Sequence, residues 1–191
     1  MRRPWKLAYA LAIAPLLAAA TSNSAGAGAY ATSPVVLNEL AAGTSGFVEL
    51  YTDSASPYDL NGHCVVYRSA TATTDGTPLA SFAKSTVIKA HGYYLLTGAA
   101  FTGVTGDVSY APRSLSQVGG TLALRHGAPG TGTVVDAVAY GTAKNPFFTT
   151  TSAPAPTSGQ SIARVPNGVN TSNNSSDFKR LATRTPGSPN Q

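Results

Sequence analysis

The sequence predicts an all-β fold, an immunoglobulin-like β-sandwich of about seven to nine antiparallel strands. Two observations favour this class. Apolar residues recur with a period of two in short segments, and clusters rich in Gly, Pro, Asn, Ser or Thr separate those segments. In addition, the connections are too short for helical crossovers, so the strands are expected to pair antiparallel.

The first three expected strands follow one another closely. They cover residues 35–40, 47–51 and 63–68. In the second strand Val48 and Leu50 share one face and Glu49 lies on the other, so that one face is apolar. A Leu-x-Gly turn at residues 60–62 leads into the third strand, which is rich in β-branched and aromatic residues.

Two hairpins and a last strand are expected further along. The first hairpin joins residues 86–88 to 93–97 through a turn that contains Gly92, and the second joins 121–125 to 134–140. Residues 160–165 are the last expected strand, and an irregular tail is expected from about 166 to 191. The core is expected to draw on Leu37, Val48, Leu50, Val65, Ile88, Leu95, Leu122, Leu124 and Val138.

Residues 1–29 have the pattern of a secretory signal peptide. Arg2, Arg3 and Lys6 precede an apolar run that is short for a membrane span, and small residues follow it up to Ala29. Cleavage near Ala29 leaves a short linker at 30–34 and one domain over 35–191, in a protein that is secreted to the periplasm or the extracellular medium. An uncleaved membrane anchor is the alternative reading of this segment.

The charge balance argues against a large nucleic-acid-binding face. Three of the 13 basic residues and none of the 8 acidic residues lie in the signal segment, so the mature chain carries a net charge of +2. The basic residues near the C-terminus are the candidates for a smaller anion-binding or nucleic-acid-binding patch, against the alternative of an ordinary solvated tail. These candidates are Arg164, Lys179, Arg180 and Arg184.

The strand segments resemble, in their order, the lamin-tail domain family as it occurs in bacterial secreted proteins. VVLNEL at 35–40, GFVELY at 46–51 and DLNGHCVVY at 59–67 resemble its first strands; IKAHGYYLLTG at 88–98 and the segment 115–141 resemble its hairpins; SIARVPNG at 161–168 with TPGSPN at 185–190 resembles the tail of bacterial copies. The chain departs from the family at His63, where Trp is common, and at His91, where Pro is common.

The resemblance implies an immunoglobulin-like sandwich that serves as a non-enzymatic binding module, or as an accessory domain beside secreted hydrolases. It implies no catalytic residues and no cofactor. The partner would be a protein, a polysaccharide or extracellular DNA, at or outside the cell surface.

The residues themselves leave one catalytic alternative, a secreted metal-assisted hydrolase or nuclease. Glu39, Glu49 and Asp136 lie in strands that are expected to be neighbours, and converging carboxylates are typical ligands of Ca²⁺. The chain has no Asp-rich calcium-binding loop, and its histidines, His63, His91 and His126, form no closely spaced ligand pair. Cys64, the only cysteine, lies within an apolar strand and is expected to be a buried, unreactive thiol.

Overall fold

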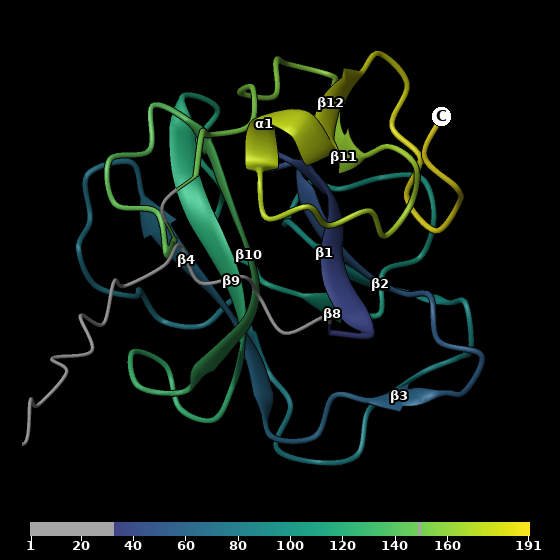
Figure 1. The fold of residues 1–191 in the computed structure, drawn as a ribbon. Coiled ribbons are helices and arrows are strands. Elements are labelled where there is room, and N and C mark those ends of the chain that lie inside the picture. The colour runs from purple at the N-terminus through teal and green to yellow at the C-terminus, as the bar shows by residue number, and fades with distance from the viewer. Residues whose placement is uncertain (1–32, 149) are drawn as a thin grey trace, which may run out of the picture.

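A computed structural model describes residues 33–148 and 150–191, which are nearly all β (Figure 1). The expected all-β sandwich is confirmed. The expected signal peptide and its cleavage site near Ala29 lie outside the described residues. Among the residues described, no helix is long and apolar enough to cross a membrane.

The described residues form 12 strands and one short helix. Eight of the strands have four or more residues: β1 (Val35–Ala41), β2 (Phe47–Thr52), β4 (His63–Ser69), β7 (Tyr93–Thr97), β9 (Gly119–His126), β10 (Thr133–Gly141), β11 (Ser161–Arg164) and β12 (Phe178–Leu181). The other four strands have two residues each: β3 (Tyr58–Asp59), β5 (Ala80–Ser81), β6 (Val87–Ile88) and β8 (Val108–Ser109). The helix is α1 (Asn174–Asp177).

Two larger sheets form the layers of the sandwich. One has six strands in the order β12-β11-β1-β2-β7-β8, and the other has four in the order β10-β9-β4-β5. Figure 1 shows β9 and β10 in one layer and β1 and β2 in the other. Strands β3 and β6 form a separate two-stranded sheet. The pairs are antiparallel as expected, except that β7 and β8 pair in parallel.

The core lies between the two larger sheets, and all nine predicted core residues are buried. Eight of them belong to one apolar cluster between the layers. Leu95 is the exception, because it points to the other face of the six-stranded sheet, where it packs with Ala41 and Phe47. Alternation along the strands therefore placed the core correctly, apart from this one residue.

The first predicted hairpin is wrong, and the second is confirmed. Strand β6 pairs with β3, whereas β7 pairs with β2, so the two expected arms enter different sheets. The turn at Gly92 does form, but His91 has a φ of 50° and its N–H donates to the carbonyl of Ser54, 3.0 Å away. Strands β9 and β10 form the second hairpin as predicted.

The prediction of an irregular tail over 166–191 is wrong in part, because the tail contains α1 and β12. The first and last residues of β12, Phe178 and Leu181, are buried, and Lys179 and Arg180 between them are exposed. This strand therefore lacks the alternation of period two on which its prediction would depend. The last ten residues then cover the outer face of β1 and β2. Asn190, for example, donates from Nδ2 to the carbonyl of Asn38 at 3.4 Å. All six residues of β2 are buried.

Candidate functional site

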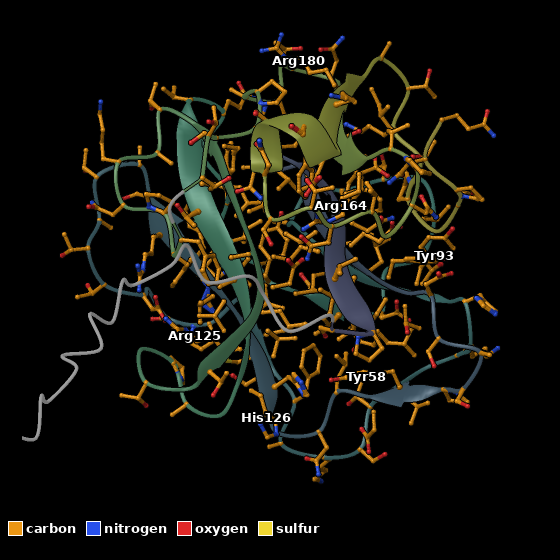
Figure 2. All side chains as sticks on the ribbon, in the orientation of Figure 1. Tyr58, Tyr93, Arg125, His126, Arg164 and Arg180 are labelled. Carbon is orange, nitrogen blue, oxygen red and sulfur yellow. The ribbon has the colours of Figure 1, made fainter. Side chains whose placement is uncertain are left out.

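Arg164, predicted as part of an exposed anion-binding patch, is instead fully buried (Figure 2). Its strand β11 is one strand inside the sheet edge, and its guanidinium donates to the carbonyls of Leu37 (2.8 Å) and Val169 (2.6 Å). Nη2 of Arg164 lies 3.0 Å from Oδ1 of Asp136, and Nη1 lies 3.0 Å from Oδ2 of Asp177. The guanidinium is therefore held by two carboxylates, and it is inaccessible to an external anion.

The other three predicted cations do not gather into one patch with Arg164. Lys179 and Arg180 are exposed on β12, at the edge of the six-stranded sheet. Arg184 is half-buried, and it donates to the carbonyls of Gln160 (3.3 Å) and Ser45 (3.1 Å). The exposed remainder of the predicted patch is thus the neighbouring pair Lys179 and Arg180.

Two of the three predicted metal-binding carboxylates do lie together. Glu39 and Glu49 are register partners on β1 and β2, as expected, but both are buried beneath the tail. Oε1 of Glu39 accepts from the N–H of Thr185 at 3.1 Å, and Oε2 of Glu49 accepts from the N–H of Gly187 at 2.6 Å. Burial raises the pKa of both carboxyls, that of Glu49 to about 8.

Asp136, the third predicted carboxylate, lies in the other sheet and binds Arg164. The three carboxylates therefore do not converge. Throughout the described ranges, 33–148 and 150–191, no group of three or more His, Cys, Asp or Glu side chains is arranged to hold a metal ion. Cys64 is buried with a free thiol, and burial raises its pKa, as expected for an unreactive cysteine.

A hollow of about 420 Å³ opens at one end of the sandwich. Its walls come from the segment just before β1, from β3 and β4, from the end of β9 and from the start of β10. The lining residues are Ser33, Pro34, Tyr58, His63, His126, Thr133, Val134 and Val135. Figure 2 shows Tyr58 and His126 at this end of the molecule and Arg180 at the opposite end.

Strand pairing brings the two histidines of the hollow together. His63 begins β4 and His126 ends β9, and the two are direct register partners in the antiparallel ladder. Their ring centroids lie 4.8 Å apart with an interplanar angle of 53°. The ring of Tyr58 meets that of His63 edge to face, with centroids 5.7 Å apart. The three rings therefore lie together in the lining and form one wall of the hollow.

The hydrogen bonds of His63 place a proton on Nδ1. Nδ1 lies 3.0 Å from the carbonyl oxygen of Leu60, which can only accept, so Nδ1 carries the proton. Nε2 lies 3.1 Å from the hydroxyl of Tyr58 and accepts from it. Both nitrogens of a neutral imidazole are thereby satisfied, and burial lowers the pKa of His63, which favours this neutral form. This part of the wall is neutral and fixed in orientation.

The grouping of His63 with His126 was missed from the sequence, where each histidine was considered alone. A signal was available: His63 opens one predicted strand and His126 directly follows another, so antiparallel pairing of these strands brings the two histidines close together. His91 lies elsewhere, with Nδ1 3.5 Å from Oδ1 of Asp53.

Compared with known proteins, the chain matches no family model and no curated sequence.

Proposed function

We propose that this protein is a secreted, non-enzymatic binding module of the lamin-tail type, which contacts its partner through the hollow. The observation that carries the proposal is the wall formed by Tyr58, His63 and His126. A concave site of a few hundred Å³ with apolar and aromatic walls and a few fixed polar groups is the usual form of a ligand-binding site. The segments that resemble lamin-tail domains support the choice of family.

The chemistry of the hollow favours binding over catalysis. Burial raises the pKa of Tyr58, so its hydroxyl stays neutral near pH 7 and is a weak nucleophile. His63 has both nitrogens engaged by protein groups, and none of the eight lining residues is a carboxylate that would orient a second base.

Export is part of this proposal. A secreted protein would meet a protein, a polysaccharide or extracellular DNA as its partner. Mass spectrometry of the protein recovered from the culture medium should give an N-terminus at or near Tyr30. Protein that is recovered only from membranes, with the first 29 residues intact, would contradict export by cleavage.

The binding function is tested by retention of the mature protein on the surface fraction of the producing cell. His126→Ala removes the exposed ring of the wall, and His91→Asn is the matched control, because His91 lies outside the hollow and Asn tolerates its positive φ. We expect the wild type and His91→Asn to be retained and His126→Ala to be lost. Equal retention of the wild type and both variants would show that the hollow is not the contact surface. If none of the three proteins is retained, the proposed binding function is wrong.

A further inference from the structure

We infer that the hollow binds a neutral carbohydrate, with a sugar ring stacked against the wall of Tyr58, His63 and His126. This inference rests on the proposed function and narrows its partner from three classes of macromolecule to one.

The charge of the lining is the first argument. None of the eight lining residues is Asp, Glu, Lys or Arg, and burial lowers the pKa of His63, which favours its neutral form. A nucleic acid is held mainly through Lys and Arg side chains placed against its phosphates, and this lining contains neither. The exposed pair Lys179 and Arg180 belongs to β12, and Figure 2 shows Arg180 at the far end of the molecule. The lining therefore matches an uncharged ligand.

The ring faces are the second argument. The C–H groups on one face of a pyranose are apolar and weakly positive, so they pack against the electron-rich face of an aromatic ring. His126 is exposed, and its ring lies against His63, which in turn lies against Tyr58. The rings are tilted with respect to each other rather than coplanar, which gives a concave wall. Pro34, Val134 and Val135 provide further apolar surface.

The hydroxyls of the lining are the third argument. Oγ of Ser33 accepts from the N–H of Val35 at 3.2 Å, and this geometry directs its own proton to another acceptor. Thr133 brings a second hydroxyl, and it is exposed. A hydroxyl both donates and accepts, so these groups complement a ligand that is itself rich in hydroxyls. A purely apolar peptide segment would cover these hydroxyls without bonding them.

The three histidines make the test direct, because two of them line the hollow and the third does not. Protein labelled with ¹³C-histidine is titrated with neutral hexasaccharides of β-1,4-linked glucose, xylose, mannose and N-acetylglucosamine, and with the neutral glycan fraction of the producing cell surface. Single-stranded DNA is the charged comparison. We expect at least one neutral glycan to move the ring resonances of His63 and His126 while those of His91 stay in place.

His126→Ala should weaken this binding at least about tenfold, the usual loss when one stacking ring is removed, and His91→Asn should leave it unchanged. The titration of the wild-type protein tests carbohydrate binding by itself. The inference therefore remains testable even if His126→Ala folds poorly. Neutral glycans that leave His63 and His126 unmoved at millimolar concentration would overturn the inference, as would a response to DNA alone. Retention on the surface fraction in that case would still uphold a binding function with another partner.

Discussion

Arg164 and Asp136 form a fully buried ion pair that joins the two layers of the sandwich, with Nη2 and Oδ1 3.0 Å apart. Arg164 belongs to β11 in the six-stranded sheet, and Asp136 belongs to β10 in the four-stranded sheet. Oδ2 of Asp136 also accepts from the N–H of Leu37 at 2.7 Å. Both β1 and β10 have a bulge at this point, and a bulge re-aims the groups beside it. The two irregularities thus meet at one polar connection inside an apolar core.

We predict that Arg164→Met lowers the free energy of unfolding by about 3–5 kcal/mol, because it leaves Asp136 and Asp177 buried without their cation. Urea denaturation measures this loss. Arg180→Met is the matched control, because Arg180 is exposed on the neighbouring strand, and it should change the stability by less than about 0.5 kcal/mol. A loss at Arg164 below about 1 kcal/mol would show that the pair contributes little.

Local alternation predicts the strands, because one apolar face per strand is needed to form a sandwich core. Val48 and Leu50 were placed in the core on that ground, and they lie there. Local alternation cannot predict the burial of Arg164, because that burial depends on carboxylates 28 and 13 residues away in the chain. An arginine in a four-residue segment near a polar tail looks like a solvated charge until those partners are known.

The tail contains a hydroxyl that reports the protonation of Glu39. Oγ1 of Thr185 lies 2.9 Å from Oε2 of Glu39 and 2.8 Å from Oδ1 of Asn190, and a hydroxyl has only one proton to donate. Nδ2 of Asn190 donates to the carbonyl of Arg164 at 3.0 Å, which fixes Oδ1 toward Thr185. Both contacts are hydrogen bonds only when Glu39 carries a proton. Burial also raises the pKa of both Glu39 and Glu49, so we expect the buried pair to hold at least one proton near neutral pH.

This proton makes docking of the tail depend on pH. Burial raises the pKa of Glu39, and it raises that of Glu49 from 4.5 to about 8. A carboxyl whose pKa is raised by folding stabilises the fold below its unfolded pKa, and that stability is lost as the pH rises through the folded value. We therefore expect the free energy of unfolding to fall by more than about 1 kcal/mol between pH 5 and pH 9 from this pair.

Glu39→Gln isolates the contribution of Glu39 to this pH dependence. The glutamine amide donates to Oγ1 of Thr185 as the protonated carboxyl does, and it does not titrate. The variant should match the wild type near pH 5 and exceed it in stability near pH 9. Urea denaturation at the two pH values measures the difference, and hydrogen exchange at Gly187 reports the tail itself. Parallel pH profiles for the variant and the wild type would contradict a protonated Glu39.

Asn174 closes the open edge of β10 in place of a neighbouring strand. Its Oδ1 accepts from the N–H of Ala139 at 2.9 Å, and its Nδ2 donates to the carbonyl of Ala137 at 3.3 Å. We predict that Asn174→Ala costs about 1–3 kcal/mol of unfolding free energy, because a buried N–H is left without a partner. Hydrogen exchange at Ala139 should also become faster. Asn173→Ala is the control, because Asn173 is exposed, and an equal effect of the two substitutions would contradict the role of Asn174.

The grouping of residues in the hollow was only partly predictable from the sequence. His63 and His126 were each noted in the sequence, and pairing of their two strands in the register of the structure is enough to bring them together. The contribution of Tyr58 was less accessible, because β3 has two residues and finds its partner in β6 only after a separation of nearly 30 residues. Contacts that depend on such short strands have no periodic signal in the sequence.

Lys179 and Arg180 give the last prediction, since they are the exposed remainder of the predicted anion-binding patch. Two cations release few counterions from DNA, so binding through them should vary with salt with a log–log slope no steeper than about −2. Filter binding over a salt series measures this slope, and Lys179→Ala with Arg180→Ala should remove the binding. The same double variant should leave the glycan response of His63 and His126 intact, because β12 lies away from the hollow. A slope of about −5 or steeper, lost in the double variant, would instead identify β12 as part of a true nucleic-acid interface.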